Sequence, residues 1–138
     1  MTLHVVDASI VVKWFLPEVH AEAAKRLLDT THDLLAPDLV WSELGNVLWK
    51  KLRRGQLERA QARAVLEDLR RYPLRIAAAE PLAGPALEIA TDLGRSFYDC
   101  LYLALAQRED SALVTADRKF YDAVRASALT SWIRWVES

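Results

Sequence analysis

The sequence predicts an α/β fold in which a mainly parallel central sheet is flanked by helices on both sides. Short apolar segments that are typical of strands alternate with longer segments of helical periodicity. The strand segments also lack a polar face, as expected when helices cover both faces of a sheet. The chain has 138 residues, 52% of them hydrophobic, so we expect a single domain over residues 1–138.

The strands are recognised as short apolar runs. The first, 3–6, contains Val5 and Val6 and ends at Asp7, and the second, 34–36, is closed by Pro37. Three further strands are predicted at 74–77, at 112–115 and, as an alternating edge strand, at 132–136.

The helices are recognised by apolar residues three and four positions apart. The first, 9–16, stops before Pro17. The clearest, 38–54, has Val40, Leu44 and Leu48 on one face, with Asp38 as a candidate N-cap and Gly55 as a stop. The others are predicted at 18–29, 58–71, 82–93, 96–109 and 118–126.

Composition excludes several classes of protein. A single cysteine, Cys100, excludes a disulfide framework or a cysteine-ligated zinc site and suits a reducing cytoplasm. No apolar run approaches the roughly 18 residues that a membrane span needs. With 18 basic and 19 acidic residues the net charge is -1, so a general basic coat for nucleic acid is excluded and a polyanion would need a local patch.

Four acidic residues lie where ligands bind in such folds, beyond the carboxyl ends of the strands. Asp7 and Asp117 each follow a predicted strand, Asp99 lies in the first turn of the helix that begins near Ser96, and Glu43 lies at the border of an apolar helix face. Each also has a structural reading, as an N-cap, a capping-box residue or a solvated helix residue. Together, however, they would converge on one edge of the sheet.

Carboxylates that converge repel one another, and protons or a cation must relieve that repulsion. Two unit charges about 4 Å apart repel by about 4 kcal/mol at an effective dielectric constant of about 20, so such a cluster takes up protons or binds a divalent ion. Oxygen ligands without His or Cys favour Mg²⁺ or Mn²⁺, and His4, His20 and His32 lie outside these segments. Such an ion suits phosphodiester hydrolysis, with Glu43 or Asp117 orienting or deprotonating the attacking water.

Polar neighbours could assist this chemistry. The hydroxyls of Ser9 and Thr115 could bond a carboxylate, a water or a substrate phosphate, or could be ordinary turn hydroxyls. Asn46 shares a helical stripe with Glu43. Lys50 and Arg54 continue that stripe as candidate phosphate contacts or as a favourable cationic helix end.

A second pair of candidate phosphate contacts, Arg118 and Lys119, directly follows Asp117. The five tryptophans are many for this length; core packing is the default reading for any one of them, and a partner surface is the alternative.

Four segments carry the acids: Val5-Val6-Asp7-Ala8-Ser9, Ser42-Glu43-Leu44-Gly45-Asn46, Phe97-Tyr98-Asp99-Cys100-Leu101-Tyr102 and Leu113-Val114-Thr115-Ala116-Asp117. In order and spacing they resemble the acidic motifs of PIN-domain nucleases, and within that family those of the VapC-like toxins of bacterial type II toxin–antitoxin systems. The resemblance implies a PIN-like three-layer sandwich. It also implies a homodimer and a cognate antitoxin that covers the active cleft.

The same resemblance implies a Mg²⁺- or Mn²⁺-dependent endoribonuclease with four catalytic acids. Asp7 and Asp99 would be direct metal ligands, and Glu43 and Asp117 would bind directly or through water. Ser9, Asn46 and Thr115 would be supporting residues.

Three other readings compete with a ribonuclease. A non-catalytic RNA- or partner-binding module is the main alternative, although a module that only binds an anion would not gather negative charge. A phosphatase of the haloacid-dehalogenase type needs a second Asp two residues after the first, where this chain has Ser9. A receiver domain needs paired acids after the first strand.

Overall fold

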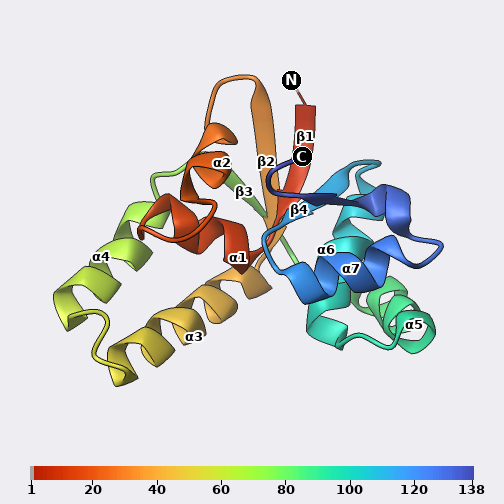
Figure 1. Ribbon diagram of the computed structural model, residues 1–138. Coiled ribbons are helices and arrows are strands. Elements are labelled where there is room, and N and C mark those ends of the chain that lie inside the picture. The colour runs from red at the N-terminus through yellow and green to blue at the C-terminus, as the bar shows by residue number, and fades with distance from the viewer. Residues whose placement is uncertain (1) are drawn as a thin grey trace.

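The computed structural model describes residues 2–138 and contains one five-stranded sheet (Figure 1). The strands are β1 (Thr2–Val6), β2 (His32–Pro37), β3 (Leu74–Ala77), β4 (Ala112–Thr115) and β5 (Ile133–Trp135), and they lie side by side in the order β3-β2-β1-β4-β5. Every strand pairing within residues 2–138 is parallel. The predicted parallel sheet is therefore confirmed.

Seven α-helices are described within residues 2–138 and lie on both sides of the sheet. They are α1 (Ala8–Val11), α2 (Ala21–Arg26), α3 (Leu39–Arg53), α4 (Arg59–Leu69), α5 (Ala83–Leu93), α6 (Phe97–Arg108) and α7 (Arg118–Arg125), with 3-10 turns at Val12–Trp14, Glu80–Leu82 and Thr130–Trp132. Helices α1 to α4 gather on one side of the sheet and α5 to α7 on the other (Figure 1). This arrangement confirms the three-layer α/β class.

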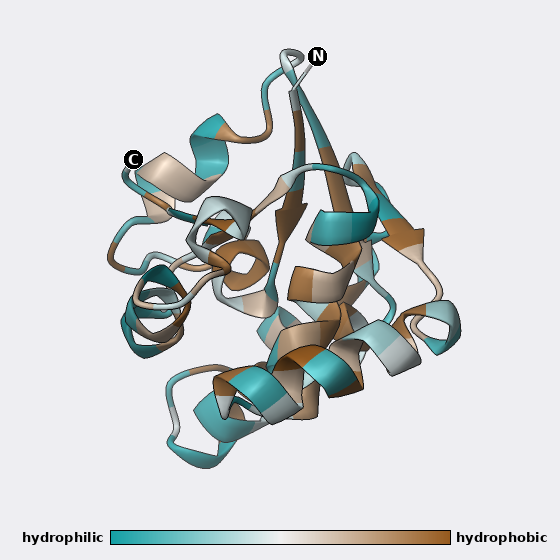
Figure 2. Ribbon diagram, turned by 90° about the vertical axis from the view of Figure 1, so that its right-hand side faces the viewer, coloured by the Kyte–Doolittle hydropathy of each residue, from teal (hydrophilic) through white to brown (hydrophobic). Residues whose placement is uncertain are grey.

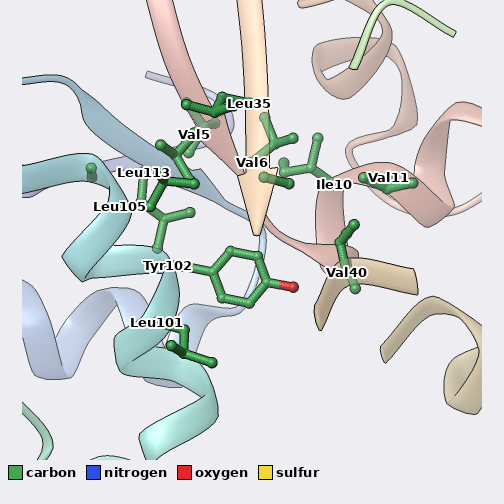
Figure 3. Close-up of a cluster of buried hydrophobic side chains, with 14 of the residues drawn as sticks. Val5, Val6, Ile10, Val11, Leu35, Val40, Leu101, Tyr102, Leu105 and Leu113 are labelled. Atoms are coloured by element: carbon green, nitrogen blue, oxygen red, sulfur yellow. The ribbon is translucent and has the colours of Figure 1, made fainter. Parts of the chain in front are cut away.

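Helix α6 forms the centre of one helical layer. Its residues from Cys100 to Ala106 are all buried, as expected of a helix that is apolar on every side. The strands are hydrophobic along most of their length, whereas the helices carry polar turns on their outer faces (Figure 2). A close-up of the core shows Leu105 of α6 next to Leu113 of β4, with the Tyr102 ring between Leu105 and Leu101 (Figure 3).

Helix α3 follows strand β2 and carries Glu43, one of the four predicted acids. Val40, Leu44 and Leu48 are its buried face, as the apolar spacing predicted. Gly55 follows the helix with a φ of +72°, a left-handed conformation that glycine adopts at low cost. Asp38 occupies the N-cap position, but its side chain makes no capping hydrogen bond.

Two helices near the N-terminus are shorter than predicted. The helix expected over 9–16 ends at Val11 and tightens into a 3-10 turn, where the Phe15 amide donates to the Val12 carbonyl oxygen at 3.2 Å. The helix expected over 18–29 begins only at Ala21, because His20 has a φ of +68°, which is incompatible with a right-handed helix. None of the helices described between residues 2 and 138 has the length and apolar character of a membrane span.

Candidate active site

The register of two central strands brings Asp7 next to Thr115. Val6 of β1 pairs with Val114 of β4, so Asp7, which directly follows β1, lies beside Thr115, the last residue of β4. The Thr115 hydroxyl donates to Asp7 Oδ2 at 2.6 Å, and the Ser9 hydroxyl donates to Asp7 Oδ1 at 2.5 Å. The Asp7 carboxylate is buried, with 7% of the residue exposed. The ends of β1 and β4 thus lie at the same edge of the sheet, as predicted, and the hydroxyls of Ser9 and Thr115 both donate to the Asp7 carboxylate.

The aspartates after the two strands also cap helices. Asp7 Oδ1 accepts from the Ser9 amide at 3.1 Å at the start of α1, and Asp117 Oδ1 accepts from the Phe120 amide at 3.2 Å at the start of α7. The amide of Asp117 donates to the Thr115 hydroxyl oxygen at 3.1 Å. The predicted role of Asp7 and Asp117 as helix N-caps is therefore confirmed, and these capping hydrogen bonds hold their carboxylates at the sheet edge.

Glu43 reaches the site from α3. The side chain is half-buried, which agrees with its predicted position at the border between the core and the solvent. The hydroxyl of Tyr102 on α6 donates to Glu43 Oε1 at 2.5 Å. Glu43 is thereby tied to the helix that also carries Asp99.

Asp99 lies in the first turn of α6, where its amide donates to the Ser96 hydroxyl oxygen at 3.1 Å. The Arg95 guanidinium donates to Asp99 Oδ2 at 3.0 Å. The same guanidinium carbon lies 5.3 Å from the centre of the Phe120 ring. Arg95 therefore holds one oxygen of Asp99 through a charge-assisted hydrogen bond.

The carboxylates perturb one another's ionisation. Burial raises the pKa of Asp7 from 3.8 to about 6; the Ser9 and Thr115 hydroxyls oppose this rise, and the charges of Glu43 and Asp117 add to it. Burial also raises the pKa of Glu43, and the charge of Asp99 adds to that rise. The pKa of Asp99 is raised by burial against the lowering effect of Arg95. Asp7, Glu43 and Asp99 therefore each feel the charge of at least one other acid of the group, as expected of a convergent cluster.

The cluster suits a hard divalent cation by the chemistry of its donors, which are all oxygen atoms. Among residues 2–138, Arg95 is the one cationic side chain that forms an ion pair with any of the four acids. As placed, however, no three Asp, Glu, His or Cys side chains of residues 2–138 form a ready-made ligand set. Glu43 is bonded to Tyr102 and Asp99 to Arg95 instead, so closing around one ion requires side-chain rotation.

Sequence reasoning missed the roles of Arg95 and Tyr102. Arg95 lies four residues before Asp99, and this i,i+4 spacing is a recognisable signal for an ion pair. Tyr102 lies one turn after Asp99 on the same helix face, but nothing in the local sequence indicates that its hydroxyl meets Glu43.

The other predicted residues form no hydrogen bond or ion pair with the side chains of the four acids within residues 2–138. Asn46, Lys50 and Arg54 are exposed along α3 and beyond its end. Arg118 is engaged elsewhere, with its guanidinium 3.9 Å from the centre of the Trp135 ring, and Lys119 is exposed.

Asp7 and Asp117 follow two parallel strands at their carboxyl ends, where ligands bind in such sheets, and the comparisons identify the family. The chain belongs to the PIN domain family, whose model matches residues 4–126. This membership confirms the resemblance seen in the motifs.

Individual relatives are similar over most of their length. The chain is 34% identical over 117 residues to Ribonuclease VapC3 of Pyrobaculum aerophilum, which covers 83% of this chain and 89% of that protein. Among solved structures, PAE2754 from Pyrobaculum aerophilum matches with a TM-score of 0.72 and 26% identity over 99% of this chain and 85% of that one. A toxin–antitoxin complex from Klebsiella pneumoniae shares the fold, with a TM-score of 0.63 and 17% identity over 95% of each chain.

Proposed function

We propose that this protein is a Mg²⁺- or Mn²⁺-dependent endoribonuclease that hydrolyses RNA phosphodiester bonds. The observation that carries the proposal is the group of four carboxylates, Asp7, Glu43, Asp99 and Asp117, in which neighbouring acid charges help to raise the pKa of Asp7, Glu43 and Asp99, while within residues 2–138 only Asp99 is paired with an arginine. Membership of the PIN domain family and 34% identity to a protein named a ribonuclease support it.

The four acids divide into two pairs in this proposal. Asp7 and Asp99 bind the cation directly, and Glu43 and Asp117 bind it directly or through water. These carboxylates would hold a divalent cation, which when bound would supply polarisation of the phosphoryl group and a lower pKa for the attacking water. Asp117, which is exposed, or Glu43 orients that water and takes its proton.

The supporting residues hold the acids and the substrate. Ser9 and Thr115 fix the plane of the Asp7 carboxylate through the two hydroxyl hydrogen bonds. We assign Asn46 to the polar rim of the site on α3. The cations Lys50, Arg54, Arg118 and Lys119 are the candidate contacts to RNA phosphates.

We further propose that the protein is the toxin of a type II toxin–antitoxin pair and forms a homodimer. Its fold is shared with a toxin–antitoxin complex, and its relative carries the name VapC3. A cognate antitoxin would cover the cleft and block access to the carboxylates.

Cleavage of defined RNAs by the purified protein tests the proposed activity. We expect cleavage in Mn²⁺ or Mg²⁺, loss of cleavage in EDTA, and no cleavage by Asp99→Asn in a folded protein. The matched control is Asp92→Asn, which changes an exposed aspartate on α5 and should cleave normally.

Cleavage by Asp99→Asn at the wild-type rate would refute the assignment of the site. Metal-independent RNA binding without cleavage would favour the non-catalytic module instead.

A further inference from the structure

Tyr102 links the hydrophobic core to the candidate active site. The residue is 1% exposed and is one of the largest fully buried side chains. Its ring extends from α6 past Leu101 and Leu105, and its oxygen points toward Val40 of α3 (Figure 3). The hydroxyl donates to Glu43 Oε1 at 2.5 Å, which joins two helices whose residues are 59 positions apart.

The hydroxyl of Tyr102 lies in the field of three of the four acids. Burial and the charges of Glu43, Asp7 and Asp99 all raise the pKa of the phenol. A phenol is protonated near neutral pH, so the Tyr102 hydroxyl is the donor and the Glu43 carboxylate the acceptor in this bond.

We infer that Tyr102 is a positioning residue that fixes the Glu43 carboxylate for metal binding and water activation. It occupies Oε1, and within residues 2–138 it is the one hydrogen-bond donor that Glu43 has. Oε2 is then the oxygen available to the cation or to the attacking water. This inference rests on the proposed function.

Packing of the Tyr102 ring in the core restricts the position of its hydroxyl. The ring is enclosed by the core, so its hydroxyl has little freedom to follow a shifting carboxylate. A hydrogen-bond partner of a metal ligand orients that ligand, and its loss typically lowers metal affinity or activity by about 10- to 100-fold. A tyrosine that merely satisfies its own buried hydroxyl would affect stability but not metal binding.

Tyr102→Phe tests the inference because it removes only the hydroxyl and keeps the ring. We expect Mn²⁺ affinity, measured by isothermal titration calorimetry, to fall by about 10- to 100-fold, with kcat reduced more than KM is changed. The matched control is Tyr121→Phe, which deletes another buried hydroxyl whose partner is Arg125 at 2.8 Å. The control should keep wild-type Mn²⁺ affinity.

A double substitution separates positioning from general loosening of the core. If Tyr102 acts through Glu43, Tyr102→Phe should have no further effect on Mn²⁺ affinity in a Glu43→Gln background. Independent effects that multiply would overturn the inference, as would wild-type Mn²⁺ affinity in Tyr102→Phe or an equal loss in Tyr121→Phe.

The wild-type protein distinguishes failure of this inference from failure of the proposed function. If wild type binds Mn²⁺ and cleaves RNA but Tyr102→Phe matches it in both, only the role of Tyr102 is wrong. If wild type binds Mn²⁺ without cleaving RNA, the proposed activity fails while the calorimetry still decides the role of Tyr102. Absence of Mn²⁺ binding by wild type overturns both.

Discussion

Replacing the buried Asp7 by Asn should stabilise the metal-free protein at alkaline pH while abolishing its response to metal. The pKa of Asp7 is raised in the folded state from 3.8 to about 6. Between these two values the folded protein keeps a proton that the unfolded chain releases. The free energy of unfolding therefore falls as the pH rises through this window, and the penalty is complete above about pH 6.

The magnitude follows from the size of the pKa shift. The shift is roughly two pKa units at about 1.4 kcal/mol each, so the full penalty is about 3 kcal/mol at pH 8. Asn keeps one acceptor oxygen for the two hydroxyls of Ser9 and Thr115, and the imperfect replacement costs about 1 kcal/mol. A net gain of about 2 kcal/mol is expected from Asp7→Asn at pH 8.

Urea unfolding in EDTA at pH 4 and at pH 8 measures this effect. The two proteins should differ little at pH 4, and Asp7→Asn should be the more stable protein at pH 8. In Mn²⁺ the order should reverse, because a cation that binds only the folded wild type stabilises it by mass action. A variant less stable than wild type at pH 8 in EDTA would refute the reasoning about the buried charge.

Two further substitutions probe the surroundings of the cluster. Arg95→Gln removes the cation that pairs with Asp99, so Mn²⁺ should bind several-fold more tightly in calorimetry; weaker binding would mean that Arg95 orders the ligand rather than competing with the cation. Phe120→Ala empties a core position that is 1% exposed and should cost about 3–5 kcal/mol in urea unfolding, whereas a cost below about 1 kcal/mol would contradict the packing of α7.

Much of the fold could be predicted because its signals are local. The strand that ends at Val6 and the helix that ends before Gly55 are encoded by apolar spacing and by one glycine with a positive φ. The helix boundaries around His20 were wrong, because a left-handed residue other than glycine has no clear signature in the sequence.

The sequence predicted the acids of the candidate site but not the partners that hold two of them. Acids that follow strands are expected at the carboxyl edge of a parallel sheet, and the pairing of Val6 with Val114 does place Asp7 beside Thr115. The partners that hold the other carboxylates, Arg95 and Tyr102, were not predicted. The Arg95–Asp99 pair has a local i,i+4 signal that was overlooked, whereas the Tyr102–Glu43 bond depends on how α6 is placed relative to α3.

The sequence by itself determined most of the segments that become strands and helices, that three carboxylates follow a strand or begin a helix while Glu43 borders a helix face, and that no histidine lies in these segments. These features depend on neighbours within about four positions along the chain, where periodicity and capping operate. Only the tertiary structure decided that Thr115 would bond Asp7 across 108 positions and that Tyr102 would bond Glu43 across 59. Such contacts are set by strand order and helix packing, which no local pattern specifies.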